Sequence, residues 1–289
     1  MELRVLKYFL MAAREENITK AAALLHITQP TLSRQLMQLE EELGVKLFHR
    51  SKHSIILTED GMLLKRRAQE MISLSDKTVK ELSHKDDMLS GEIAIGCGET
   101  GSMMFLSEQI RDFRQKYPLV QFSIYSAIAD DIKERIEKGI LDMGLLVEPV
   151  DISKYEFVRM PQKEQWGILT RRDSKLALKK HICPEDLADV PLLMVKRDLV
   201  KNELSSWFGE YYEQLHISAT YNLIINAAAM VRSGVGTALC FDLGIKYHDD
   251  LCFVPLMPVL KTGSVLVWKK NQAMSKISAH FIQTIKNVI

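Results

Sequence analysis

Hydrophobic positions near the amino terminus predict two short helices separated by a tight turn. The first apolar set recurs at intervals of three and four residues, the spacing of one helical face, and comprises Ile18, Ala21, Ala22 and Leu25. After a break at residues 26 and 27, a second stripe follows: Leu32, Leu36, Leu39 and Leu43. Thr28 can cap this second helix, Pro30 suits its first turn, and Gly44 suits its end. The pattern predicts a helix-turn-helix.

Polar side chains on the second helix suit the reading of base edges. Gln pairs with adenine and Arg with guanine through paired hydrogen bonds, and Ser or Thr can contact bases or phosphates. The candidate DNA-binding residues of this segment are Thr28, Gln29, Pro30, Thr31, Ser33, Arg34 and Gln35. Residues 45 to 57 alternate loosely and predict a hairpin wing that touches phosphate or the minor groove through Arg50, Lys52 and His53. A polar-surfaced helical hairpin without DNA is the alternative that spacing alone leaves open.

A long helix is predicted over residues 59 to 88. Thr58 can cap it, and Glu59 and Asp60 suit the positive end of its dipole. A narrow apolar seam follows its length, including Leu64, Ala68, Ile72, Val79 and Leu82. Packing on its own domain is one interpretation of this seam. The position between two predicted domains favours pairing with a second copy, so we predict at least a homodimer.

The remaining chain has the rhythm of an α/β protein. A polar run at residues 83 to 90 closes the long helix, and short apolar strands then alternate with helices. The last strand and helix, residues 265 to 268 and 275 to 288, have no following partner and can return to the first series. We therefore predict two lobes, one of residues 89–161 plus 268–289 and one of residues 162–267.

The amino-terminal sixty residues resemble the LysR-type transcriptional regulators. The resemblance is carried by Ala21-Ala22, the run from Leu24 to Pro30, Ser33-Arg34-Gln35, Leu39-Glu40, Leu43-Gly44, Leu47-Phe48, Arg50, Leu57-Thr58 and Gly61. Residues 142–145, 186–187 and 231–236 extend it less densely. It implies a multidomain α/β protein with a winged helix-turn-helix (1–58), a dimerising linker helix (59–88) and a two-lobed regulatory domain (89–289) that resembles periplasmic binding proteins.

The same resemblance implies partners. A twofold dimer of helix-turn-helix domains reads two half-sites, so the expected target is double-stranded operator DNA with interrupted dyad symmetry. Regulators of this family also form tetramers as dimers of dimers, and RNA polymerase is a further candidate partner. A small-molecule effector between the lobes is expected to modulate DNA binding or activation.

Candidate effector contacts lie where strands end and helices begin, because free backbone amides there favour anions. The resemblance places the first such turn, with Thr100, Gly101 and Ser102, in the effector pocket. Further candidates are Ser126, Ala127, Met194, Lys196 and Asn226. Helix capping is the alternative for the glycine turn and the favoured role of Asn226, and an ordinary solvated lysine is the alternative for Lys196. We expect a small carboxylate or an amphiphilic metabolite, and Glu99 and Glu148 disfavour a highly anionic ligand.

Composition limits these interpretations. A chain of 289 residues with 47% hydrophobic content suits two or three compact units. Because the net charge is only +1, DNA binding must depend on local basic groups. No apolar run approaches the ~20 residues of a membrane span, and the chain opens directly into an amphipathic helix. We therefore expect a cytoplasmic protein.

Catalytic and metal chemistry find little support. Cys97, Cys183, Cys240 and Cys252 are widely scattered without metal-ligand spacing, which predicts reduced thiols and no metal site. A redox-sensing regulator that uses a cysteine is the alternative. No nucleophile with a base, paired carboxylates or phosphate loop is evident, so we expect no enzyme and no cofactor. A solute-binding protein or an α/β enzyme is the less favoured interpretation.

Overall fold

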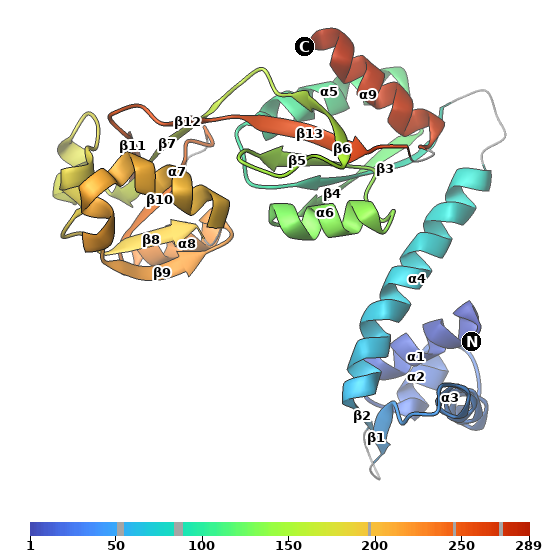
Figure 1. Ribbon diagram of the computed structural model, residues 1–289. Coiled ribbons are helices and arrows are strands. Elements are labelled where there is room, and N and C mark those ends of the chain that lie inside the picture. The colour runs from blue at the N-terminus through green and yellow to red at the C-terminus, as the bar shows by residue number, and fades with distance from the viewer. Residues whose placement is uncertain (51–54, 84–88, 196–197, 245–246, 272–273) are drawn as a thin grey trace. The chain divides into compact units, whose positions relative to one another are not determined.

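The protein divides into two compact units, residues 1–85 and 86–289. The structure, a computed structural model, describes residues 1–50, 55–83, 89–195, 198–244, 247–271 and 274–289. Each unit builds its own hydrophobic core. Figure 1 shows the elements of both units.

The first unit is a winged helix-turn-helix. It contains α1 (Leu3–Glu15), α2 (Ile18–Leu24), α3 (Gln29–Leu43), β1 (Phe48–Arg50), β2 (Ile55–Leu57) and α4 (Glu59–Ser83). The predicted wing is an antiparallel pair that aligns Phe48 with Leu57. Lys52 and His53, and the side chain of Arg50, lie outside the described residues.

The buried stripe of α3 differs from the predicted one at its last turn. Leu32, Leu36 and Leu39 are buried as expected, but Leu43 is 38% exposed. Glu40 is buried instead, and its Oε1 accepts hydrogen bonds from the backbone amides of Leu47 (2.9 Å) and Phe48 (3.3 Å). The carboxylate thus satisfies the chain that leaves the helix after Gly44, where φ is +70°.

The two predicted threonine caps differ in outcome. Thr28 occupies the N-cap position of α3, but its hydroxyl bonds the Thr31 hydroxyl (2.8 Å) instead of a backbone amide. Pro30 in the first turn offers no amide, so one usual donor for such a cap is missing. Thr58 caps α4 as predicted, because its Oγ1 accepts from the amide of Gly61 at 3.0 Å.

The second unit contains two lobes, each with its own sheet. Lobe 1 contains β3 (Gly91–Cys97), α5 (Ser102–Lys116), β4 (Val120–Ser126), α6 (Ala129–Glu137), β5 (Met143–Val147), β6 (Tyr155–Arg159), β13 (Ser264–Lys269) and α9 (Lys276–Val288). Its strand order is β4-β3-β5-β13-β6. β4 and β5 flank β3 in parallel, whereas β13 is antiparallel to both neighbours.

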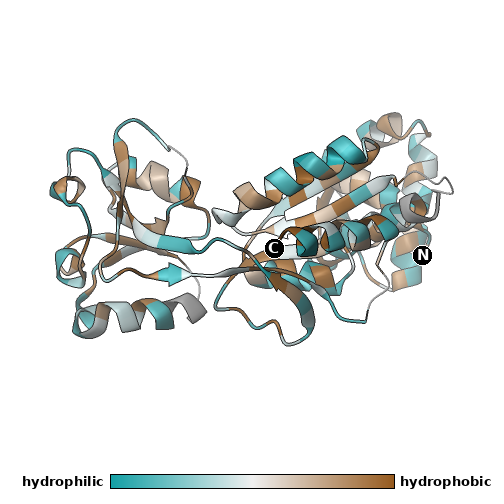
Figure 2. Ribbon diagram, turned by 90° about the horizontal axis from the view of Figure 1, so that it is seen from above, coloured by the Kyte–Doolittle hydropathy of each residue, from teal (hydrophilic) through white to brown (hydrophobic). Residues whose placement is uncertain are grey.

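Lobe 2 has the order β11-β7-β10-β8-β9, with β12 beside β7. Its elements are β7 (Glu164–Arg171), β8 (Leu192–Val195), α7 (Asp198–Phe208), β9 (Ile217–Tyr221), α8 (Ile224–Arg232), β10 (Thr237–Phe241), β11 (Leu251–Pro255), β12 (Lys261–Thr262) and the 3-10 helices Lys175–Leu178, Pro184–Leu187 and Gly209–Gln214. The chain crosses between lobes from β6 to β7 and from β12 to β13 (Figure 1). In Figure 2 the helices carry both hydrophilic and hydrophobic residues.

The return to lobe 1 comes earlier than predicted. β13 begins at Ser264, and residues 265–267 pair with both β5 and β6 at the interior of the sheet. Lobe 1 therefore resumes at residue 264 and not at residue 268. Val265, Leu266 and Val267 are fully buried, which explains why this short run is entirely apolar.

Candidate DNA-binding and effector-binding sites

The polar face of α3 is accessible. Thr28, Gln29, Pro30 and Arg34 are exposed, whereas Thr31, Ser33 and Gln35 are half-buried. Gln35 donates to Gln38 through its side-chain amide at 3.2 Å. Arg34 makes no hydrogen bond or ion pair with any residue that the structure describes, so its guanidinium is available to an external acceptor.

The turn before α3 brings the two helices close together. His26 adopts a left-handed conformation with φ of 55°, and the amide of Ile27 bonds the carbonyl of Ala22 at 3.0 Å. Ala21 and Ala22 are buried, and their small side chains allow α2 to approach the core. α3 is therefore held on one side by apolar packing while its polar side stays open.

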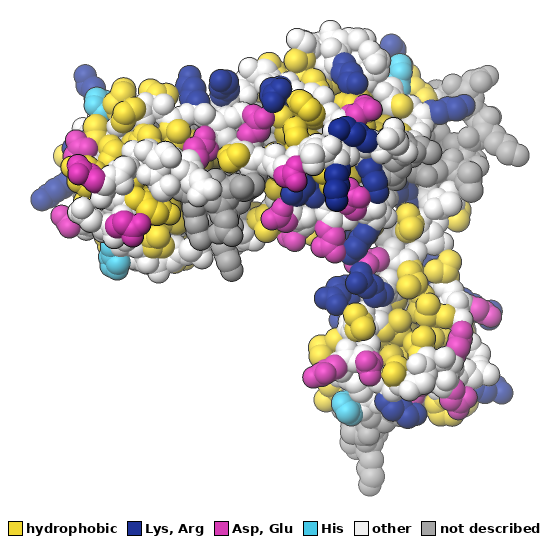
Figure 3. Space-filling model, in the orientation of Figure 1, with side chains coloured by type: hydrophobic (Ala, Val, Ile, Leu, Met, Phe, Trp, Pro, Cys, Tyr) yellow, Lys and Arg dark blue, Asp and Glu magenta, His cyan; other side chains and the backbone are white. Residues whose placement is uncertain are grey.

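The apolar seam of α4 has two parts. Ala68 is fully buried in the core of its own domain, and Leu64 and Ile72 pack against that core. These three residues thus follow the alternative interpretation, and Ala68 is not available to a second copy. Val79, further along, is 61% exposed, and the side chain of Leu82 is not described. Leu63 and Leu74 are also exposed, at 49% and 44%. Hydrophobic side chains are visible along this unit in Figure 3.

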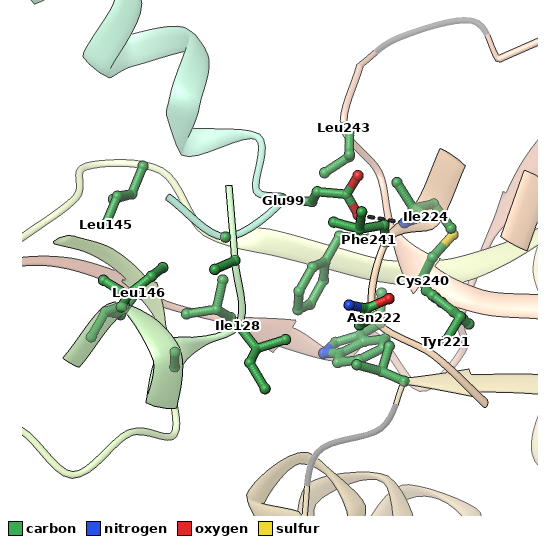
Figure 4. Close-up of a pocket in the computed structure, with 18 residues that line it drawn as sticks. Glu99, Ile128, Leu145, Leu146, Tyr221, Asn222, Ile224, Cys240, Phe241 and Leu243 are labelled. Atoms are coloured by element: carbon green, nitrogen blue, oxygen red, sulfur yellow. Dashed lines mark hydrogen bonds between the residues drawn. The ribbon is translucent and has the colours of Figure 1, made fainter. Parts of the chain in front are cut away.

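A pocket of about 100 Å³ lies between the two lobes (Figure 4). Lobe 1 lines it with Gly98, Glu99, Ala127, Ile128, Ala129, Ile132, Leu145, Leu146 and Val147. Lobe 2 contributes Trp166, Val195, Tyr221, Asn222, Leu223, Ile224, Cys240, Phe241 and Leu243. This volume is smaller than that of an engineered apolar cavity of about 150 Å³ that holds benzene, so the pocket as it stands suits only a small ligand.

Of the predicted effector residues, only Ala127 belongs to this lining. Thr100, Ser102 and Met194 are buried elsewhere, Gly101 is half-buried, Ser126 and Asn226 are exposed, and Lys196 lies outside the described residues. Asn226 is also not the cap of α8, because the helix begins two residues earlier and Leu223 holds the N-cap position. The effector role of these residues stays a prediction.

A buried carboxylate explains why Thr100, Gly101 and Ser102, which follow β3, do not line the pocket. Glu164, at the start of β7, is 3% exposed and lies at the N-terminus of α5. Its Oε2 accepts from the amide of Gly101 (2.8 Å), and its Oε1 accepts from the amide (3.2 Å) and hydroxyl (2.8 Å) of Ser102. The hydroxyl of Thr100 also donates to Oε1. The donors that sequence reasoning assigned to an effector are therefore bound by a carboxylate from lobe 2.

A second carboxylate crosses in the opposite direction. Glu99, from lobe 1, accepts a hydrogen bond from the amide of Ile224, the first residue of α8 (dashed line in Figure 4). Burial raises the pKa of Glu99, and the hydrogen bond from Ile224 opposes that shift. Each lobe thus places one glutamate at a helix N-terminus of the other lobe, where the helix dipole favours negative charge.

The thiols of all four cysteines are free. Burial raises the pKa of the Cys97 thiol to about 12, and burial also raises the pKa values of Cys183, Cys240 and Cys252. Reactive cysteines carry lowered pKa values, so these environments disfavour thiolate chemistry. Among the described residues, no group of three or more His, Cys, Asp or Glu side chains could hold a metal ion.

Comparisons with known proteins agree with these features. Residues 3–62 match the model of the bacterial regulatory helix-turn-helix protein, lysR family, and residues 86–289 match the LysR substrate binding domain. The chain belongs to the LysR family. It is accordingly a DNA-binding transcriptional regulator with an effector-binding domain. The matches favour this interpretation over the three alternatives, a redox-sensing regulator, a solute-binding protein and an α/β enzyme.

Relatives of this LysR-type regulator match it over most of their length. The transcriptional regulator AlsR of Bacillus subtilis is 30% identical over 262 residues, covering 86% of this chain and 85% of AlsR. YybE of Bacillus subtilis is 27% identical and covers 99% and 98% of the two chains. The structure of full-length CbnR complexed with its target DNA has the same fold, with a TM-score of 0.81, 22% identity and full coverage of both chains.

Several pocket residues were not predicted from the sequence. Tyr221 and Phe241 end β9 and β10, and Trp166 lies near the start of β7, so only the topology brings them together. Glu164 was missed because its partners are 62 to 64 residues away.

In the part of the chain that is described, no helix is sufficiently long and apolar to cross a membrane.

Proposed function

We propose that this LysR-type regulator binds, as a homodimer, an operator with interrupted dyad symmetry by placing α3 in the major groove. The open polar face of α3, with Arg34 unengaged among the described residues, is the observation that carries this proposal. Gln29 and Arg34 are the proposed base readers, and Thr28, Thr31, Ser33 and Gln35 support them. The wing, with Arg50, Lys52 and His53, contacts phosphates or the minor groove.

The proposed assembly uses exposed apolar residues of α4. Leu63 and Leu74 present hydrophobic surface, and a second copy of the helix would cover it. Two dimers can associate into a tetramer, and RNA polymerase is the proposed partner at the promoter. We place this activity in the cytoplasm.

A small molecule in the pocket between the lobes is the proposed input. It changes DNA binding or activation only if it binds one arrangement of the lobes better than another. The apolar lining and the crossing glutamates support this role, since a ligand there contacts both lobes. The function needs neither catalysis nor any cofactor besides this effector.

Selection of bound sequences from random DNA by the purified full-length protein tests the DNA-binding proposal. The selected sites should contain two half-sites related by dyad symmetry. Gln29→Ala and Arg34→Ala should each lose about 1–3 kcal/mol of the free energy that distinguishes the correct base from the others at one position of each half-site. This loss corresponds to roughly 5- to 150-fold in affinity. Arg111→Ala, which removes an exposed arginine of α5, is the matched control.

Equal melting temperatures for the three variants would show that each domain is still folded. If Gln29→Ala and Arg34→Ala bound the selected DNA as tightly as Arg111→Ala, α3 would not be the reading helix. Selected sites without symmetry would contradict binding as a twofold dimer.

A further inference from the structure

The two helices that begin at the junction of the lobes already bind the protein's own carboxylates. Glu164 accepts from both backbone amides and both hydroxyls that α5 offers there, and it is only 3% exposed. Glu99 accepts from the first amide of α8. An anionic ligand could reach either helix only by displacing a glutamate, against the repulsion of that charge.

The lining of the pocket carries one charged side chain among the described residues, that of Glu99. One oxygen of Glu99 accepts from Ile224, and the other has no hydrogen-bond partner in the described part of the chain. Lys196, next to the lining residue Val195, is not described. The pocket therefore offers a half-buried, negatively charged hydrogen-bond acceptor.

Aromatic rings complete this environment. Trp166 and Phe241 both line the pocket, and their ring centroids are 4.2 Å apart. Tyr221 uses its hydroxyl to donate to the carbonyl of Leu239, so its ring, and not its hydroxyl, serves the lining. Aromatic rings pack against an apolar body and a carboxylate pairs with an ammonium group, so the combination suits an organic cation with an apolar body.

We propose that the pocket binds a small organic cation with an apolar body, whose ammonium group pairs with the free oxygen of Glu99 while its body lies against Trp166 and Phe241. The proposal rests on the effector role of the pocket. It replaces the small carboxylate that sequence reasoning favoured, because the helix N-termini that would have bound a carboxylate already hold Glu164 and Glu99.

Three probes with the same ring separate the classes: benzylamine, benzyl alcohol and benzoate, each titrated calorimetrically into the full-length protein at neutral pH. Benzylamine should bind about tenfold or more tightly than benzyl alcohol, and benzoate should bind most weakly. Glu99→Gln keeps an oxygen for the Ile224 amide but removes the charge. It should reduce benzylamine affinity about tenfold and leave benzyl alcohol within about twofold, whereas Glu108→Gln, an exposed glutamate of α5, should change neither.

Benzoate binding as tight as benzylamine, benzylamine binding unaffected by Glu99→Gln, or no binding of benzylamine would each overturn the proposal. Operator affinity measured with and without benzylamine separates this outcome from the function itself. If benzylamine binds through Glu99 but operator affinity and in vitro transcription are unchanged, the ligand class is supported and the effector role of the pocket fails.

Discussion

Replacing Glu164 with Gln tests whether the carboxylate between β7 and α5 holds the regulatory domain together. Gln has the same shape but carries an NH₂ group in place of one carboxylate oxygen. Its single oxygen can still accept from Thr100 and Ser102 at the position of Oε1. Its NH₂ group would then face the amide of Gly101, so two donors would point at each other.

The magnitude follows from these contacts. A hydrogen bond to a charged group contributes about 1 kcal/mol more than a neutral one, and Oε1 accepts three such bonds. The unpaired, half-buried amide of Gly101 adds about 1 kcal/mol, and because neighbouring contacts are not additive we expect a net loss of about 3 kcal/mol. For a domain of this size, that loss lowers the melting temperature by roughly 6–12 °C.

Thermal unfolding of the full-length protein, followed by tryptophan fluorescence, measures this change. Trp166 lies two residues from Glu164 on β7 and is 1% exposed, so it reports on this region. Glu108→Gln, on the exposed side of α5, is the control and should stay within about 0.5 kcal/mol of the parent. A Glu164→Gln protein that melts together with the control would refute the structural role of this carboxylate.

Two further predictions concern the first unit. In Gly61→Ala the new methyl group would meet the carbonyl oxygen of Leu47 and come 2.9 Å from Cδ2 of Leu57, so urea unfolding should show a loss of about 3 kcal/mol. At Gly44 an added methyl group would have open space, but φ is +70°, so Gly44→Ala should lose only about 1–2 kcal/mol of unfolding free energy. Equal losses in the two variants would contradict a steric clash at Gly61. When Leu63→Glu is combined with Leu74→Glu, the mass measured by light scattering should fall from that of a dimer to 33.0 kDa, whereas Ser73→Glu should keep the mass of a dimer. A mass of 33.0 kDa for the parent protein would exclude the dimer.

Local signals explain why the helix-turn-helix could be predicted from the sequence. Its helix starts and stops depend on Pro30, Gly44 and Thr58, whose preferences act within one turn of chain. The central strands were equally predictable, because β5 and β13 are buried on both faces and consist of apolar runs.

Features that depend on distant parts of the chain were not predictable in the same way. β6 and β9 lie at the edges of their sheets and mix exposed with buried residues, so no apolar run marks them. Glu40 is buried although a charged side chain is expected at the surface, because two backbone amides need an acceptor. The pairing of Glu164 with α5 likewise depends on the crossing from β6 to β7, which no local pattern encodes.

The two crossing glutamates offer a ligand unequal opportunities. Both oxygens of Glu164 are engaged and the side chain is sealed from solvent, so a ligand has no route to weaken its contact with α5. Glu99 is half-buried, lines the pocket and uses one oxygen. A bound cation would reduce the negative charge that favours the N-terminus of α8, and it would do so only at this contact. Since a ligand shifts an equilibrium only by its differential affinity, the signal should begin as a change between Glu99 and α8 while α5 stays fixed to β7.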